Sequence, residues 1–437
     1  MASPRDRNGI LPVKWVIPSG RCSMHERPSV PQETRRLALL VNTLQGGGAE
    51  RVAVSLLESL SPGEETPLSL VLLENKATLE VPRGTPVFSL SASLRGDPHK
   101  LASLLLGAWR LRRLVREQGF TLVLSSLERA NFVNVIARLL GSPHRTVVSE
   151  HTNPRENYRG RSLRNLAARQ LVRFLYRRAD AVIAVSEGVK KSLVDDFAVP
   201  GNLISVIHDP LDLDRIDRLA REDPKFAWFE EDVPIIVTTG RLEEPKGQAH
   251  LLRAFAVVRG KRPCRLVIVG EGSLRPDLER LAHSLAIESD VALIGWQDNP
   301  YQYMARSTVF AFPSLWEGFS VALAEALACG LPAVSFDCES GPQEILQEGR
   351  YGVLVPVGDE ARLAEEILRL LNDPVRRQEL SSRARERARD FALPIIALAY
   401  RTVLKGGARH RFASPRASQS TQGPQDSAGH NPSRDHS

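Results

Sequence analysis

A chain of 437 residues is too long for one ordinary domain, so two domains are the first expectation. With 42% hydrophobic and 25% charged residues, its composition is that of a globular protein and argues against a fibrous or largely disordered chain. A net charge of +7 would suit nucleic acid, anionic lipid or phosphorylated small molecules, so the location of the positive charge matters more than its sum.

Cysteine usage and hydropathy narrow the class of protein. The four cysteines lie far apart, form no CxxC pair and have no histidine cluster beside them: Cys22, Cys264, Cys329 and Cys338. We therefore expect reduced, mostly buried thiols and neither a disulfide framework nor a zinc site. No apolar run approaches the roughly 18 to 20 residues that span a bilayer, and the short apolar stretch near the N-terminus is a poor secretion signal. The sequence thus predicts a cytoplasmic protein.

Both ends of the chain are predicted to be disordered tails. Residues 1–35 are rich in Pro, Arg and Ser, and residues 406–437 have too little apolar surface to fold. Between residues 36 and 212, short β-branched runs alternate with helical patterns, which is typical of βαβ units around a parallel sheet. The expected strands are 37–42, 68–73, 87–90, 122–125, 146–150, 181–185 and 204–207, with helices that include 49–60 and 101–118.

Three consecutive glycines join the first expected strand to the first helix. Gly46, Gly47 and Gly48 would let the backbone approach a ligand closely, and the start of the following helix adds amides that attract anions. A tight left-handed turn explains one glycine but less readily three. We therefore expect Gly47 and Gly48 to bind a ligand.

A histidine and a basic segment follow the strand at 146–150. His151 stands at the end of that strand, but a lone histidine is more often structural, so its position alone leaves both roles open. From Arg155 to Arg178 the chain carries eight arginines against one acidic residue, Glu156. Three of them recur at helical spacing, namely Arg169, Arg173 and Arg177.

The basic helix expected there has two interpretations that the sequence leaves open. It would suit an anionic membrane surface, where each basic residue contributes about 1 kcal/mol, or it is the solvated face of a soluble helix. Nucleic acid is not an expected partner, because aromatic residues make up only 6% of the chain and no nucleic-acid module is recognisable.

A charged, Pro-containing stretch at 213–232 interrupts the alternation and is predicted to connect two domains. Asp212 and Asp214 form an Asp-x-Asp pattern there, which we interpret as structural and not as a metal site. The alternation resumes from 233 to 390, with strands expected at 235–238, 266–269, 291–294, 309–312, 333–336 and 353–355. The predicted fold class is α/β, with two Rossmann-like doubly wound domains whose ligands bind beyond the carboxyl ends of the strands.

Two cations lie on the loop after the strand at 235–238. Arg241 and Lys246 are five positions apart on a loop shaped by Gly and Pro, which suits a diphosphate leaving group. Two exposed surface cations are the plain alternative. Gly270 and Gly272 follow the next strand, but as a dinucleotide-binding pattern they are weak because no third glycine follows at the required spacing.

The strongest local signal is the strand–loop–helix pattern at 312–332. Glu317 comes just before a predicted helix that Gly330 and Pro332 end. Glu325 lies eight positions further on, roughly 12 Å along the helix, so the two carboxylates suit opposite ends of one long ligand. The amides at the helix start are expected to form an anion site, made by Gly318, Phe319, Ser320 and Val321.

The Glu317-x7-Glu325 element and its flanks, Pro-Ser-Leu-Trp-Glu-Gly-Phe and Glu-Ala-Leu-Ala-Cys-Gly-Leu-Pro, resemble retaining glycosyltransferases of the GT-B fold, family 4 (group 1). Among these are bacterial enzymes that build lipid-linked glycans or polysaccharides. The resemblance implies that Glu325 binds the ribose of a nucleotide sugar and that Glu317 faces the donor sugar. It also implies that the helix-start amides, Arg241 and Lys246 hold the diphosphate without an obligatory metal or other cofactor, and that the base lies near Gln297.

The resemblance extends to the first half of the chain. Gly47 and Gly48 belong to a Gly-Gly-Ala-Glu-Arg loop that the family places near the donor phosphate and the acceptor. His151 matches a histidine over the reactive centre, and the resemblance implies that His151 and Glu317 are the catalytic residues. The family's hinge normally opens with Asn-Pro, whereas this chain has Asp209 before Pro210, which puts a ligand contact at that position in doubt. The last helix, at 391–405, is expected to cross back to the first domain. Glu344 lies in a segment similar to one near the sugar pocket and is given no role.

The resemblance thus implies transfer of a sugar, with UDP as the expected nucleotide, to a hydroxyl of a glycan or polyprenyl-linked saccharide. The acceptor is expected mainly on the first domain and the donor on the second, with peripheral contact to the inner face of the membrane through the basic helix. Two alternatives stay open: an epimerase of GT-B-like fold that acts on the nucleotide sugar itself, and a non-catalytic sugar-binding homologue.

Overall fold

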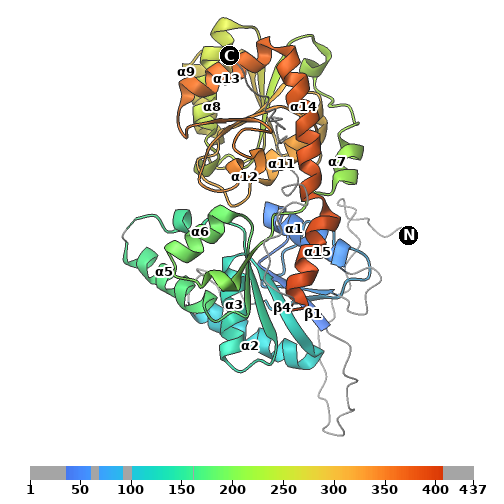
Figure 1. Cartoon of the computed structure of the whole chain (residues 1–437), viewed down its shortest axis with the longest axis vertical. Helices are drawn as coiled ribbons and strands as arrows, with labels where there is room; N and C mark the ends of the chain where they lie inside the picture. Colours follow the sequence, from blue (N-terminus) through green and yellow to red (C-terminus); the bar gives the residue numbers. More distant parts are fainter. Residues whose placement is uncertain (1–35, 61–67, 92–100, 161, 407–437) are drawn as a thin grey trace, which may run out of the picture.

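The computed structural model describes residues 36–60, 68–91, 101–160 and 162–406. Two α/β domains are stacked along the longest axis of the molecule, the first below and the second above (Figure 1). Apart from Gly406, the tails expected at 1–35 and 406–437 lie outside the described residues.

The first domain is built on a parallel sheet of seven strands in the order β3-β2-β1-β4-β5-β6-β7. All seven strands expected from the sequence are present, because a sheet that is buried on both faces selects continuous apolar runs. The strands are β1 (Arg36–Val41), β2 (Leu68–Leu72), β3 (Val87–Ser89), β4 (Phe120–Ser126), β5 (Arg145–Glu150), β6 (Ala181–Ala184) and β7 (Ile204–Val206).

Helices cover both faces of this sheet (Figure 1). On one face, Leu56 of α1 and Tyr400 of the last helix, α15, belong to one buried apolar cluster. On the other face, Leu111 of α2 and Val133 of α3 belong to another. The helices of this domain are α1 (Gly48–Leu60), α2 (Leu101–Gln118), α3 (Glu128–Leu139), α4 (Pro154–Asn157), α5 (Leu163–Tyr176), α6 (Glu187–Asp195) and the short 3-10 helix η1 (Gly201–Leu203).

The second domain repeats the plan with a parallel sheet of six strands in the order β10-β9-β8-β11-β12-β13. Its strands are β8 (Ile235–Thr239), β9 (Arg265–Val269), β10 (Val291–Gly295), β11 (Val309–Phe312), β12 (Ala333–Phe336) and β13 (Val353–Val355). Its helices are η3 (Glu244–Lys246), α8 (Gln248–Lys261), α9 (Arg275–Ser284), η4 (Glu288–Asp290), α10 (Tyr301–Ala305), α11 (Val321–Ala328), α12 (Pro342–Leu346), α13 (Glu360–Asn372), α14 (Pro374–Ala388) and η5 (Arg389–Phe391).

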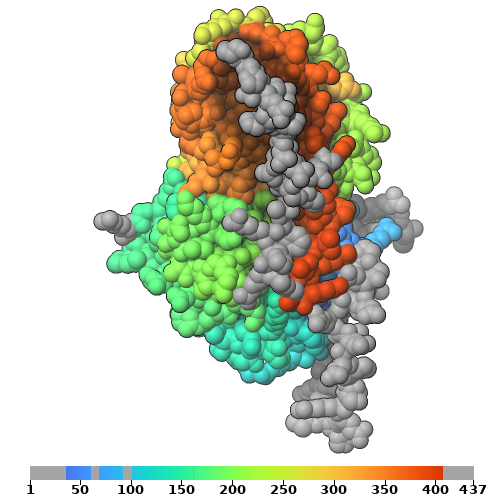
Figure 2. Space-filling view, in the orientation of Figure 1, coloured from blue at the N-terminus to red at the C-terminus, as the bar shows by residue number. Residues whose placement is uncertain are grey.

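Two crossings of the chain join the domains. The first passes through the hinge, residues 209–211, into α7 (Leu213–Leu219) and η2 (Ala227–Glu230), so the expected connector contains a helix, whose first turn Asp212 caps. The second returns through η5 to α15 (Leu393–Leu404), which runs down beside the first domain in Figure 2. The crossings are tied to each other, because the Leu211 amide donates to Phe391 O at 2.8 Å and the Leu393 amide donates to Leu211 O at 2.8 Å.

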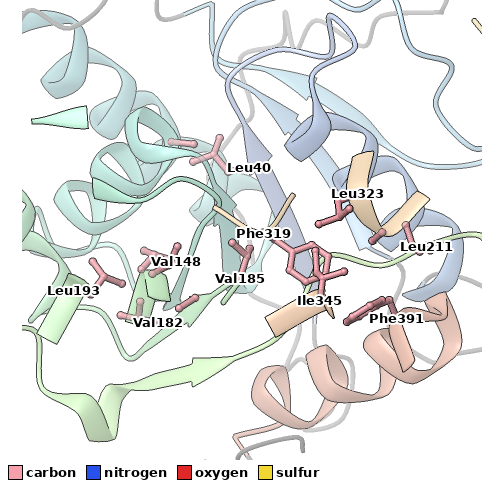
Figure 3. Packing of buried hydrophobic residues seen from close by; sticks show 14 of the residues in the cluster. Leu40, Val148, Val182, Val185, Leu193, Leu211, Phe319, Leu323, Ile345 and Phe391 are labelled. Carbon is pink, nitrogen blue, oxygen red and sulfur yellow. The ribbon is translucent and has the colours of Figure 1, made fainter. Parts of the chain in front are cut away.

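One apolar cluster is continuous between the domains (Figure 3). Val185 of the first domain, Leu211 of the hinge and Phe319 of the second domain belong to it. The sequence places Phe319 on the predicted helix, but α11 begins only at Val321. The physical reason is Ser320, whose left-handed φ of 82° precedes the first helical residue and separates Phe319 from the helix.

Candidate functional site

A cavity of ≈ 770 Å³ lies between the two domains. Loops that follow the carboxyl ends of β1, β5, β8, β9, β10 and β11 line it, which is where ligands bind in doubly wound sheets. All twelve side chains or backbone segments that the sequence proposes for binding or catalysis are on its wall: Gly47, Gly48, His151, Arg241, Lys246, Gln297, Glu317, Gly318, Phe319, Ser320, Val321 and Glu325. Residues distant in the sequence therefore share one hollow.

Lys246 and Glu317 form an ion pair on this wall, with Lys246 Nζ 2.5 Å from Glu317 Oε1. Gly247, which follows Lys246, has φ 62°, and a Cβ there would lie 2.1 Å from Pro313 O. Glycine at 247 thus lets the loop after β8 lie directly on the loop after β11, which brings the cation to the carboxylate. Arg241 lies on the same loop as Lys246 and is exposed toward the cavity.

The Gly-x-Gly turn after β9 has a packing role. A Cβ at Gly270 would lie 2.0 Å from Gly240 O, and one at Gly272 would lie 2.3 Å from Leu242 O. These glycines therefore hold the β9 loop against the β8 loop that carries Arg241. The sequence pattern indicates these two glycines but does not predict that they are needed for loop packing.

The start of α11 faces the cavity. Its first intrahelical hydrogen bonds are those from Leu323 N and Ala324 N to Ser320 O, so the amides of Ser320 and Val321 come before the bonded turn. Such amides attract anions. The side chain of Phe319 points away from the cavity, since it is only 1% exposed and stacks on His208 with ring centroids 5.0 Å apart. Phe319 can therefore offer a ligand only its backbone.

Gly318 brings the two walls of the cavity into contact. A Cβ at this position would lie 2.0 Å from the carbonyl oxygen of His151, in the other domain. The Gly318 carbonyl also accepts a hydrogen bond from Ser186 Oγ at 2.7 Å. The segment that precedes α11 is thus held against the first domain by backbone contacts.

Glu325 also lines the cavity and is 8% exposed. Its Oε1 accepts a hydrogen bond from the Tyr301 hydroxyl at 2.7 Å. Burial raises the pKa of Glu325, while the Arg51 guanidinium and the Tyr301 hydroxyl oppose the rise. Arg51 reaches across from α1 and lies 5.2 Å from the ring centroid of Trp296, so the two domains also meet here. Nothing in the local sequence indicated Tyr301 or this pair.

The side chain of Gln297 is already engaged by protein. It donates to Ile294 O at 3.0 Å and accepts from the Tyr303 hydroxyl at 3.1 Å. Gly47 is engaged too, because its amide donates to Glu50 Oε2 at 2.9 Å. At Gly48, by contrast, a Cβ would meet nothing within 4 Å. Of the two glycines predicted to bind a ligand, Gly48 therefore has free space beside its Cα, whereas the amide of Gly47 is already bonded.

His151 has protein groups at both ring nitrogens. Its Nε2 lies 3.0 Å from Ser149 Oγ, and its Nδ1 lies 3.0 Å from Asp209 Oδ1. The side chains of His151 and Asp209 are only 4% and 6% exposed. Asp209, whose role the sequence leaves in doubt, thus lines the cavity beside the predicted catalytic histidine.

Glu344 joins the two domains on another side. Its carboxylate accepts from the amides of Glu187 and Gly188 at 2.9 and 3.1 Å, at the start of α6 in the first domain. It also lies 3.2 Å from His208 Nε2. Glu344 therefore caps a helix of the other domain, a role that its own sequence neighbourhood does not reveal.

The prediction of a single basic helix from Arg155 to Arg178 is wrong. The structure has the short α4 and then α5, which begins after Gly160, with φ 85°, and Ser162, whose side chain caps the new helix. Arg155 is not part of a basic helical face, because it pairs with Asp196 and with Glu339 of the second domain.

What remains on α5 is a mixed basic and apolar surface. Leu163, Leu166 and Phe174 are 85%, 53% and 48% exposed. A surface pocket of ≈ 320 Å³ lies beside them and is lined by Gln170, Arg173, Phe174, Arg177 and Arg178. In the part of the chain that the structure describes, no helix is long and apolar enough to cross a membrane.

Comparison with known proteins identifies the chain. Two family models match, "Glycosyltransferase Family 4" over residues 46–215 and "Glycosyl transferases group 1" over residues 220–389. The N-acetylgalactosamine-N,N'-diacetylbacillosaminyl-diphospho-undecaprenol 4-alpha-N-acetylgalactosaminyltransferase of Campylobacter jejuni is 33% identical over 358 residues, which cover 82% of this chain and 96% of that protein. A second Campylobacter N-acetylgalactosaminyltransferase is 26% identical and 83% of this chain is covered.

Solved structures agree on the fold. Anabaena HepE in complex with UDP has a TM-score of 0.69 at 21% identity, with 85% of this chain and 100% of that chain covered. Sucrose-phosphate synthase from Thermosynechococcus elongatus has a TM-score of 0.73 at 21% identity, with 85% and 98% covered. With its two parallel-sheet domains and their shared cavity, the chain belongs to the group 1, or family 4, glycosyltransferases and is a glycosyltransferase of the GT-B fold.

Proposed function

We propose that this glycosyltransferase moves a sugar from a UDP-sugar to a hydroxyl of a saccharide carried on a polyprenyl diphosphate, with retention of configuration and without an obligatory metal. One observation carries the proposal: Lys246, Glu317, the start of α11 and Glu325 face the same cavity between the domains. A nucleotide sugar needs such a sequence of groups, namely a carboxylate for the ribose, amides and cations for the diphosphate and a polar wall for the sugar.

The charges on the cavity wall suit the departure of a nucleoside diphosphate. Negative charge grows on the diphosphate as the glycosidic bond breaks, and fixed cations and amide dipoles aimed at it lower the barrier. Arg241, Lys246 and the amides of Ser320 and Val321 supply them. Glu317 holds Lys246 in place at 2.5 Å and reaches the same region, where the sugar would lie.

The acceptor side of the proposal has two supports. The relative at 33% identity is named for transfer to a saccharide on diphospho-undecaprenol. In addition, α5 and the two residues that follow it expose Arg173, Arg177 and Arg178 together with Leu163 and Phe174, a combination that suits the surface of an anionic membrane, where such an acceptor resides. We propose that α5 contacts that surface.

Retention is part of the same proposal. The acceptor hydroxyl approaches from the face that the diphosphate leaves, so both lie on the cation-bearing side of the sugar. An epimerase would change the nucleotide sugar with no acceptor present, and a non-catalytic binding protein would leave it unchanged.

Lys246→Ala and Glu317→Ala test the proposal. With a panel of nucleotide sugars and a polyprenyl-diphosphate saccharide, Lys246→Ala should lower the transfer rate by at least about 100-fold, the effect of removing one group that stabilises a developing anion. Glu317→Ala should lower it by about as much, because Lys246 loses the carboxylate that holds it in place. Lys261→Ala, at the exposed end of α8, is the control and should keep the wild-type rate. Product linkage by NMR reads the stereochemistry, and chelator should leave the rate unchanged. Wild-type rates in both site variants would refute the proposal.

A further inference from the structure

His151 cannot offer a ring nitrogen to a ligand without giving up a protein contact. Ser149 Oγ lies 3.0 Å from Nε2 and Asp209 Oδ1 lies 3.0 Å from Nδ1, and both His151 and Asp209 are nearly buried. The Asp209 contact is at ion-pair distance but outside the angles of a linear hydrogen bond. It is therefore an electrostatic contact between a carboxylate and the ring.

A carboxylate at this place selects one state of the ring. An ionised carboxylate has only acceptor atoms. It therefore attracts a protonated Nδ1 and repels the lone pair of an unprotonated one. With the proton on Nδ1, Nε2 accepts from the Ser149 hydroxyl. An asparagine would offer both a donor and an acceptor and would make no such selection.

Asp209 reaches His151 from the hinge, not from the sheet that carries the histidine. Two residues further on, Leu211 is bonded to the returning crossing at Phe391 and Leu393. Tyr400 of that returning chain is fully buried. Burial first, and then the Asp209 charge, raise the pKa of Tyr400.

We propose that Asp209 is a positioning residue for sugar transfer, whose carboxylate holds the His151 ring in one orientation and in the Nδ1-protonated tautomer on the wall of the cavity. In this arrangement His151 shapes the wall with its ring and backbone, and its two nitrogens serve the protein and not a proton transfer. The effect on rate rests on the proposed function, whereas the effect on the ring does not.

Asp209→Asn removes the charge and keeps the shape. In protein labelled with ¹⁵N-histidine, the two ring nitrogens of His151 should move from the pattern of one tautomer to that of a mixture, with the signals assigned from their loss in His151→Gln. The value of kcat should fall by about 100-fold, because a slight displacement of the cavity wall misplaces the bound sugar, and a misplacement of about 1 Å costs that much. KM for the donor should change by less than about 3-fold, since ground-state binding is not removed.

Asp212→Asn is the matched control. It removes a carboxylate three residues along the same connector, where Asp212 caps α7, and asparagine caps helices equally well. Both the ring signals and kcat should stay at wild-type values. Ser149→Ala removes the other ring contact without touching the hinge and should also shift the ring signals, so it carries the test if Asp209→Asn does not fold.

Three results would overturn the inference. The first is unchanged nitrogen signals in Asp209→Asn or, where that variant does not fold, in Ser149→Ala. The second is a wild-type kcat in Asp209→Asn, and the third is a raised KM at constant kcat, which would make Asp209 a sugar-binding group. The ring signals are read in the ligand-free enzyme. A tautomer shift in a protein that transfers no sugar would therefore count against the proposed function alone.

Discussion

The two walls of the cavity are assembled in different ways. On the second domain, Lys246, Glu317 and Glu325 come from loops and a helix that directly follow strands, and Gly247 lets two of these loops touch. On the first domain, His151 lies 3.0 Å from Oδ1 of the hinge residue Asp209, and the Asp209 charge also acts on the buried Tyr400 of the last helix, whose pKa it raises after burial. One wall is thus made by local geometry and the other by parts of the chain that meet only when both crossings are in place.

The contact between the walls is the most sensitive point of this comparison. Gly318→Ala would place a Cβ 2.0 Å from His151 O and push the walls apart. We expect the transfer rate to fall by roughly 100-fold, as for other misplaced sites, with little change in thermal melting. At Gly260, on α8, a Cβ meets nothing within 4 Å, so Gly260→Ala should keep the rate and gain about 0.5 to 1 kcal/mol of stability. Equal rates for the two variants would show that the walls need not touch.

The next prediction compares how arginines on the outer surfaces of the two domains contribute to membrane binding. Replacing Arg173, Arg177 and Arg178 together by alanine should weaken binding to anionic vesicles by about 100-fold, since each basic residue contributes about 1 kcal/mol at such a surface. Co-sedimentation at low and high salt measures it. The same triple change in the second domain, at the exposed Arg280, Arg350 and Arg383, should have little effect. A similar loss from both triples would show only a response to net charge.

The buried carboxylate of the second wall should make nucleotide binding depend on pH. Burial raises the pKa of Glu325 above the ordinary value of 4.5, so as the pH falls the group becomes protonated earlier than an exposed glutamate and loses its strength as an acceptor. UDP affinity should therefore decrease as the pH is lowered, and the decrease should begin at a higher pH than an ordinary glutamate would cause; calorimetry at a series of pH values measures it.

Variants of two tyrosines test whether Glu325 is the group whose protonation weakens nucleotide binding. Tyr301→Phe removes the hydroxyl that lowers the pKa of Glu325, so the loss of affinity should begin at a higher pH. Tyr303→Phe removes a hydroxyl that bonds Gln297 and should leave the pH dependence unchanged. An identical shift in both variants would mean that Glu325 is not the titrating group.

The smallest expected effect is at the cross-domain pair of Arg51 and Trp296. A guanidinium 5.2 Å from an indole centroid at an exposed site contributes about 0.5 to 1 kcal/mol. A double-mutant cycle with Arg51→Ala and Trp296→Ala on UDP affinity should return a coupling of that size. A coupling of zero would show that this pair adds nothing to the other contacts between the domains, which include Gly318, the Glu344 cap and the Arg155–Glu339 ion pair.

The contrast between the walls also explains what could be predicted from the sequence. Arg241, Lys246, Glu317 and Glu325 each follow a buried strand or lie on the next helix, so their common location follows from the strand pattern and the family motif. The strands themselves are predictable because both sheets are buried on two faces. The start of α11 is less so, since the left-handed φ of Ser320 has no marker in the sequence.

The rest of the site depends on contacts between distant residues. Asp209 comes beside His151, and Glu344 beside α6, only through the packing of the two domains. The break between α4 and α5 was visible in part, because Gly160 and Ser162 are ordinary signals for the end of one helix and the start of another. The arginine pattern outweighed them in the prediction of one basic helix.

The paired crossings at Leu211 set the way in which the cavity can open. Two segments of chain that are bonded to each other at one point cannot slide independently, so one domain must turn against the other about that pivot. Displacement grows with distance from a pivot, and Asp209 lies only two residues from it. Rotation would carry Lys246 and Glu325 away from the first domain while Asp209 and His151 kept their separation. The His151 ring would therefore keep its orientation from one reaction cycle to the next.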